Sequence, residues 1–185
     1  MLEENKKEVK IEEAVNYEGS EVYGSREVME FKERTEEHFR PIGGLTATEI
    51  EEMVEEYVNT KLMENDFDAE VVGVAISGSR CRGLEGKHSD LDVVVEYTGD
   101  EREDDMFNLL HEDKFSIGGV PVDINPITEY RTGTLEEYLP GVEKYLEEKR
   151  GKLSVMEKLK EKKSVVQAND ENATKSAVKK IENVR

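Results

Sequence analysis

The sequence is poor in proline, tryptophan and cysteine. Among its 185 residues there are four prolines, no tryptophan and one cysteine, Cys81. A single cysteine excludes an internal disulfide and favours a reducing compartment. No hydrophobic run approaches the roughly 18 residues of a membrane span, and residues 1–10 lack the apolar stretch of a signal peptide. We therefore expect a cytoplasmic protein with no membrane association.

The charge of the chain is negative and unevenly distributed. Overall, 44 Asp and Glu residues against 26 Lys and Arg residues give a net charge of -18. Residues 151–185 contain nine basic and five acidic residues, a net of +4, which leaves 17 basic and 39 acidic residues, a net of -22, in residues 1–150. A field of this sign repels phosphate backbones, so the sequence argues against a nucleic-acid partner.

Hydrophobic patterning divides the chain into three parts. Residues 1–41 are rich in glutamate with scattered apolar residues, and we expect a partly disordered acidic arm in which a short helix over Glu27–Phe39 could form. Residues 42–150 contain enough apolar residues for one compact domain. Residues 151–185 show weak patterning and are expected to form a basic, mostly disordered tail.

The central part alternates between helical and strand patterns. Apolar residues at helical spacing predict helices, short continuous apolar runs predict buried strands, and Gly118-Gly119 predicts a hairpin turn. Thr134 with Glu137 can cap a last helix, which Pro140-Gly141 is expected to break into two pieces. The other predicted helices cover 46–63 and 104–111, and the predicted strands cover 71–76, 91–97, 114–117 and 120–125.

A glycine-containing turn follows the first predicted strand. Gly78 and Gly83 have the spacing of a Walker A loop, but Leu84 and Glu85 stand where that motif requires lysine and a hydroxyl residue, so the motif is excluded. The remaining Gly78-Ser79 turn could bring backbone N–H groups and a hydroxyl close to a phosphate. An ordinary turn between two elements is the alternative that the residues leave open.

Three aspartates are placed in the sequence so that they could act together with this turn. Asp90 and Asp92 lie two residues apart at the start of a predicted strand, so their side chains share one face. Asp123 lies between two apolar residues of a later strand and is expected to point away from the core. If the two strands are neighbours, three carboxylates converge near the serine turn, and hard oxygen ligands of this kind suit Mg²⁺. If Asp90 and Asp92 are considered without Asp123, the alternative interpretation is that they are solvated residues at the end of a strand.

Other arrangements with known chemistry do not fit the sequence. The histidines and the cysteine are not spaced as a zinc-binding set, and no Ser-His-Asp grouping is recognisable. The residues concerned are His38, His88, His111 and Cys81.

The combined pattern resembles the polymerase β-type nucleotidyltransferase superfamily. Its signature is an apolar strand ending in Gly-Ser, about ten residues, and then Asp-x-Asp; here Arg80–Ser89 supplies the ten intervening residues. The GSRCRG…SDLDVVV version is most similar to the minimal, MNT-type branch, and the resemblance covers roughly residues 46–130. It implies an α+β fold in which helices flank a small mixed β-sheet, with poorly ordered N- and C-terminal extensions.

The resemblance also implies a role for each motif residue. Two Mg²⁺ ions, for which Mn²⁺ could substitute, would be held by Asp90 and Asp92, and Asp123 would complete the ion that activates the acceptor hydroxyl. The terminal phosphates of the nucleotide would contact four residues of the turn, of which the two arginines could instead form surface salt bridges. These four residues are Gly78, Ser79, Arg80 and Arg82.

The expected reaction is transfer of a nucleoside monophosphate, AMP in the first instance, from an NTP such as ATP to a hydroxyl group. The acidic core argues against RNA as acceptor, and antibiotic-modifying relatives carry an additional helical domain. We therefore expect a protein acceptor, as in antitoxins that adenylylate a partner toxin. A small-molecule (aminoglycoside-type) acceptor and a non-catalytic interaction module stay as alternatives. Tyr17 and Tyr23 of the arm are candidate acceptors within the chain.

Overall fold

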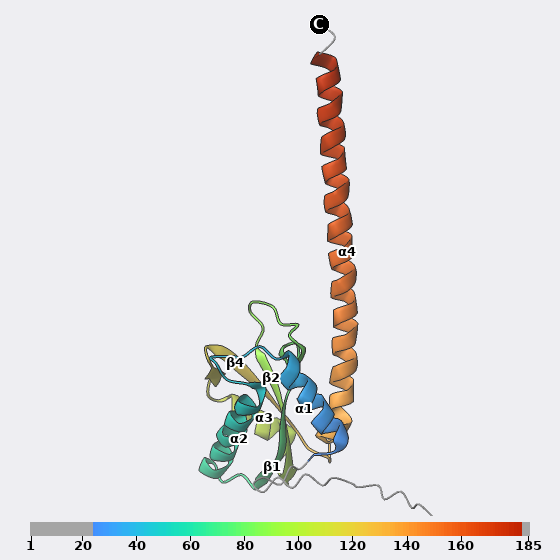
Figure 1. Ribbon diagram of the computed structural model, residues 1–185. Coiled ribbons are helices and arrows are strands. Elements are labelled where there is room, and N and C mark those ends of the chain that lie inside the picture. The colour runs from blue at the N-terminus through green and yellow to red at the C-terminus, as the bar shows by residue number, and fades with distance from the viewer. Residues whose placement is uncertain (1–23, 183–185) are drawn as a thin grey trace, which may run out of the picture.

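A small mixed β-sheet with helices packed around it forms the body of the protein (Figure 1). The computed structural model describes residues 24–182, with the surroundings of side chains described for residues 24–160, so Tyr17, Tyr23 and the first part of the expected arm lie outside the described residues. The elements in chain order are α1 (Arg26–His38), α2 (Ala47–Glu64), β1 (Ala69–Ile76), the 3-10 turn η1 (Arg80–Arg82), β2 (Leu91–Gly99), α3 (Glu103–His111), β3 (Ser116–Ile117), β4 (Val120–Ile127) and α4 (Leu135–Glu182).

The sheet has the strand order β1-β2-β4-β3 and confirms the predicted α+β class. Strand β1 is antiparallel to β2, whereas β2 and β4 are parallel neighbours, and β3 forms the predicted hairpin with β4. Helix α2 packs on β1 and α3 packs on β4. The parallel pairing places Asp92 directly beside Asp123, because these residues are register partners on β2 and β4. The topology therefore brings together carboxylates that are about thirty residues apart in the chain.

Helix α1 belongs to the core rather than to a separate arm. Its residues Val28 and Phe31 are buried, and so is Phe39 immediately after it. The helix predicted within the arm is thus present, and it packs with the domain expected for residues 42–150, so the expected arm of residues 1–41 includes part of the folded body. This packing could not be predicted from the sequence, because α1 buries only a narrow stripe of an otherwise charged helix.

Helix α4 runs without interruption across Pro140-Gly141, so the predicted break is wrong. The capping prediction is confirmed, since Thr134 Oγ1 accepts from Glu137 N at 3.4 Å and Thr134 N donates to Glu137 Oε2 at 3.2 Å. Proline removes one backbone hydrogen bond in this early part of the helix, and packing on both sides of it compensates the loss. The residues that anchor α4 to the core are Leu135, Leu139 and Leu146.

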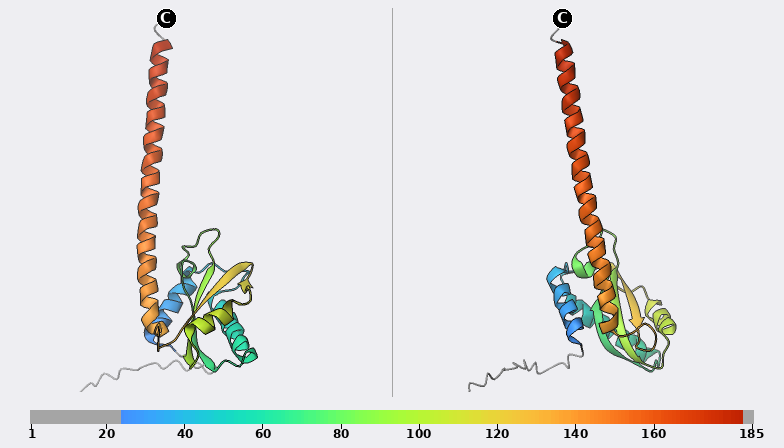
Figure 2. Two further views of the ribbon diagram at one scale, coloured as in Figure 1. Left: turned by 180° about the vertical axis from the view of Figure 1, so that it is seen from behind. Right: turned by 90° about the vertical axis from the view of Figure 1, so that its right-hand side faces the viewer.

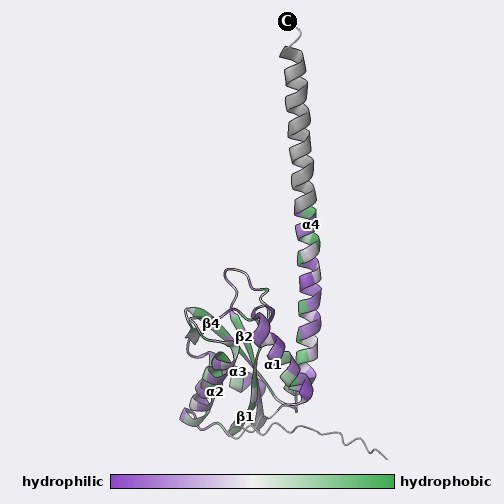
Figure 3. Cartoon of the chain, viewed as in Figure 1, coloured by the Kyte–Doolittle hydropathy of each residue, from purple (hydrophilic) through white to green (hydrophobic). Residues whose placement is uncertain are grey.

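Beyond residue 150, α4 leaves the body of the protein (Figure 2). Its backbone is helical to Glu182, whereas the sequence led us to expect a mostly disordered tail. All described side chains from 151 to 160 are exposed, and purple polar residues alternate with green apolar residues along this stretch (Figure 3). A helix without tertiary packing has little stabilisation beyond its own hydrogen bonds. The degree of order of this extension therefore stays a prediction.

None of the helices in residues 24–182 combines the length and the hydrophobicity that crossing a membrane requires.

Candidate active site

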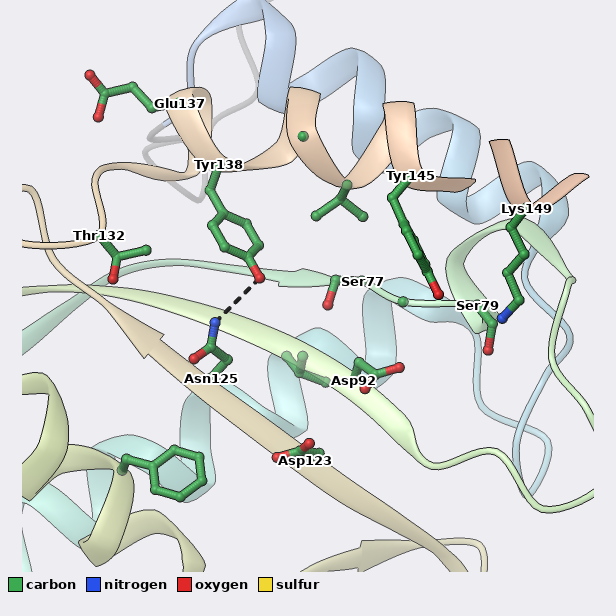
Figure 4. A pocket seen from close by; sticks show the side chains of 15 residues that line it. Ser77, Ser79, Asp92, Asp123, Asn125, Thr132, Glu137, Tyr138, Tyr145 and Lys149 are labelled. Carbon is green, nitrogen blue, oxygen red and sulfur yellow. Dashed lines mark hydrogen bonds between the residues drawn. The ribbon is translucent and has the colours of Figure 1, made fainter. Parts of the chain in front are cut away.

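A cavity of about 760 Å³ opens between the sheet and helix α4. Figure 4 shows its two walls: strand residues, including Asp92 and Asp123, form one wall, and side chains of α4 point toward them from the other. Gly78 and Ser79, which connect β1 to η1, line the cavity as well. The structure therefore brings the serine turn and two of the three predicted carboxylates into one site.

Gly78 is required by the geometry of this site. Its φ of 62° is in the left-handed region, and a Cβ added there would overlap the Oδ2 atom of Asp92. The backbone of the turn can thus lie against the carboxylate only because the residue has no side chain. Ser77 N donates to the Asp92 carbonyl oxygen at 2.8 Å, which ties the end of β1 to the start of β2. Ser79 is buried and lines the cavity beside them.

The carboxylates on the sheet wall repel one another. Burial first, then the negative charges of Asp123 and Asp90, raise the pKa of Asp92 above its ordinary value. Asp90 itself, immediately before β2, is exposed and is not part of the cavity lining. A bound cation would relieve this repulsion, and the carboxylate donors fit Mg²⁺ or Mn²⁺. Within the described residues, however, no group of three or more acidic, histidine or cysteine side chains is already assembled around a metal position.

Both arginines of the turn are engaged outside the cavity. Arg80 donates to the carbonyl oxygens of Ser89, at 2.6 Å, and Asp90, at 3.0 Å, and so holds the loop before β2 closed. Arg82 is buried and forms an ion pair with Glu143 of α4 at 2.5 Å. Neither arginine is part of the cavity lining, so the expected contacts of Arg80 and Arg82 with the nucleotide stay predictions.

Arg82 joins three elements of the fold. Its Nη1 donates to Thr35 Oγ1 of α1 at 2.8 Å, and its guanidinium lies 4.3 Å from the centre of the Phe31 ring. With the ion pair to Glu143, these contacts fasten α1, η1 and α4 to each other. The arginine therefore helps to seat the helix that forms the second wall of the cavity.

The positively charged side chain in the cavity lining comes from helix α4 and not from the turn. Lys149 is half-buried, lines the cavity together with Ser79 and points from α4 toward the sheet wall (Figure 4). Its positive charge lowers the pKa of Asp92, although burial and the neighbouring carboxylates outweigh it. Sequence reasoning missed this lysine. The available signal was the helical spacing of Tyr138, Val142, Tyr145 and Lys149, which places them on one face, next to the face that packs on the core.

Three further hydrogen bonds hold parts of the described site together. Asn125 of β4 donates to the hydroxyl of Tyr138 at 3.4 Å, linking the two walls. The buried carboxylate of Glu103 accepts from Thr128 N and Thr132 N, both at 3.0 Å, and fixes the loop that brings Thr132 to the cavity.

The mixed sheet brings a glycine turn and adjacent carboxylates together, an arrangement that can position and neutralise the charges of a transferring phosphoryl group. The chain belongs to the family described as nucleotidyltransferase domain, whose profile matches residues 58–177, and hence to the polymerase β-type superfamily. Membership of this family supports a nucleotidyltransferase that uses an NTP, with a divalent metal as the group's usual cofactor. Searches of curated proteins and of solved structures give no match. The assignment to the MNT-type branch stays a prediction.

Proposed function

We propose that this protein transfers AMP from ATP to a hydroxyl group of a partner protein in a Mg²⁺-dependent reaction, in the manner of an adenylylating antitoxin. The observation that carries the proposal is the cavity in which the Gly78-Ser79 turn, the Asp92–Asp123 pair and Lys149 meet. A polyphosphate needs close backbone groups, a hydroxyl and positive charge, whereas the acidic wall needs a divalent cation. The cavity contains the protein's contribution to each requirement.

Each residue has a defined task in this proposal. The N–H groups of the turn, the Ser79 hydroxyl and the Lys149 ammonium group bind the terminal phosphates. Asp92 and Asp123, with Asp90 at the edge, would hold the metal ions. When bound, these ions would stabilise charge on the phosphates and increase the acidity of the acceptor hydroxyl. The acceptor hydroxyl releases its proton to solvent, its oxygen bonds to the α-phosphorus, the bond from the α-phosphorus to the oxygen that bridges it to the β-phosphorus breaks, and pyrophosphate leaves.

A protein acceptor is supported by the exposed part of α4. Four large apolar residues of this extension are solvent-exposed, and its sequence is basic, in contrast to the acidic body. An amphipathic, oppositely charged helix is suited to docking a partner beside the cavity. The residues are Leu153, Val155, Met156 and Leu159. The rival proposal is a non-catalytic module, and it is consistent with the finding that the side chains described for residues 24–160 include no preassembled group of three or more possible metal ligands.

Calorimetric titration with ATP, GTP, CTP and UTP, each with and without Mg²⁺, tests the site directly. We expect Mg²⁺-dependent binding, tightest for ATP, that is lost when Asp90 and Asp92 are both replaced by asparagine. The asparagine variant keeps the shape of both side chains and therefore controls for folding. If the folded wild-type protein binds no nucleotide, the enzyme proposal is wrong and the interaction module is favoured.

A further inference from the structure

His111 ends helix α3 directly above strand β4, and sequence analysis left it without a role. Its Nε2 atom lies 3.0 Å from Oδ1 of Asp123, the carboxylate that is the register partner of Asp92. The helix that carries it is anchored by buried Met106 and Leu110. The position of the imidazole over β4 is therefore set by core packing of α3 and not by the contact alone.

The imidazole ring is fixed on three sides. Nδ1 lies 2.8 Å from the carbonyl oxygen of Phe107, which can only accept a hydrogen bond. The Phe107 ring stacks on the imidazole with 3.9 Å between ring centres and 24° between planes. Nε2 is thereby directed at Asp123, and its distance to Oδ1 is that of a hydrogen bond. A ring held this firmly can fix the orientation of its partner.

Asp123 needs such a partner. Its side chain is 56% exposed, so core packing does not select its rotamer. Among the described residues, the hydrogen bond from His111 is the contact recorded for its carboxylate. This bond engages Oδ1 and leaves Oδ2 for other ligands. A preorganised oxygen binds a cation more tightly than one that must first be ordered.

We propose that His111 is a positioning residue that orients Asp123 for the divalent metal, an inference that rests on the proposed function. The histidine acts through the carboxylate and does not contact the metal or the nucleotide. Its removal should weaken metal binding only as long as Asp123 is present to be oriented. A residue that merely terminates α3 would instead affect metal binding equally with or without the carboxylate.

The test is a thermodynamic cycle of Mn²⁺ binding, followed by electron paramagnetic resonance in the presence of the non-hydrolysable analogue α,β-methylene-ATP. We expect His111→Met to weaken Mn²⁺ binding about tenfold, within the range found for residues that support metal ligands. In an Asp123→Asn background the same substitution should have no further effect. Thermal melting of each variant establishes that it is folded.

A second pair of variants keeps the test decisive if His111→Met is unstable. Glutamine places an N–H donor close to the position of Nε2, whereas asparagine places it close to Nδ1, so His111→Gln should retain Mn²⁺ affinity that His111→Asn loses. Equal affinities for these two variants, or an equal loss in both Asp123 backgrounds, would overturn the positioning role alone. Absence of Mn²⁺ and nucleotide binding by the wild-type protein would overturn the proposed function as well.

Discussion

The two walls of the cavity are built in different ways. On the sheet wall, Gly78, Asp92 and Asp123 are placed by backbone hydrogen bonds and strand register. On the helix wall, Tyr138 and Lys149 are placed by the packing of α4 and by one buried ion pair. The sheet wall is acidic and by itself repels a nucleotide, so we infer that phosphate binding depends on how firmly the helix wall is seated.

Removing a carboxylate from the sheet wall should have the largest effect. Asp92→Asn keeps the size of the side chain but removes a charge that a metal ion requires. Metal stabilisation of several kcal/mol corresponds to a loss of roughly 10³-fold in rate, which can be measured as pyrophosphate release from ATP. Asp100→Asn, an exposed substitution just beyond the opposite end of β2, is the control and should leave the rate unchanged.

Breaking the ion pair that seats α4 tests the other wall. Arg82→Leu leaves Glu143 without its buried partner, and we expect the free energy of unfolding to fall by about 3 kcal/mol in urea denaturation. Arg34→Leu is matched to it, because Arg34 contacts the same carboxylate at 3.6 Å from an exposed position and should cost less than about 1 kcal/mol. Equal losses of unfolding free energy in the two variants would show that the burial of Arg82 does not strengthen its contribution to stability.

A side chain at Gly78 should damage the junction between the strands. Gly78→Ala introduces both an unfavourable left-handed backbone and an overlap with Asp92. Gly119→Ala has a comparable φ of 80° but an added Cβ meets no atom within 4 Å, so it measures the backbone cost of about 1–2 kcal/mol alone. We expect Gly78→Ala to be less stable than this control and, unlike it, to lose Mg²⁺-dependent ATP binding in calorimetry.

The smallest predicted effect comes from the cation of the helix wall. Lys149→Met should weaken ATP binding about tenfold, since hydrogen bonds to charged groups contribute about 1.5–3 kcal/mol and Lys149 is partly solvated. AMP binding should change less, because AMP lacks the terminal phosphates. Lys152→Met removes an exposed lysine of the same helix and should have little effect. An equal loss of ATP and AMP affinity would argue against a phosphate contact.

The sheet wall could be predicted because its residues are encoded by local pattern. An apolar strand before Gly78-Ser79 and alternation around Asp92 and Asp123 are visible within short windows of sequence. Parallel pairing of β2 with β4 could not be derived from those windows. In the sequence interpretation it is a condition, namely that the two strands are neighbours, and the structure meets that condition through the register of Asp92 with Asp123.

The helix wall could not be predicted because tertiary packing decides it. Pro140-Gly141 indicated a break, and only the burial of α4 on the core explains why the helix continues far enough to present Lys149. Arg82 shows that a residue close to the Gly78-Ser79 motif in the sequence can still lie outside the cavity lining. It lies three residues after Ser79 in the sequence, but the direction of its side chain depends on a single turn of 3-10 helix and on partners in α1 and α4.

The most direct test of the central claim is to follow the phosphates of ATP. The protein is incubated with Mg²⁺ and cell extract in two parallel reactions, with ATP labelled at either the α- or the γ-phosphate and Asp92→Asn as control. The account predicts that the α-label becomes covalently attached to a protein, that the γ-label leaves in pyrophosphate, and that the variant transfers neither. Attachment of the γ-label, or α-labelling that persists in the variant, would contradict it.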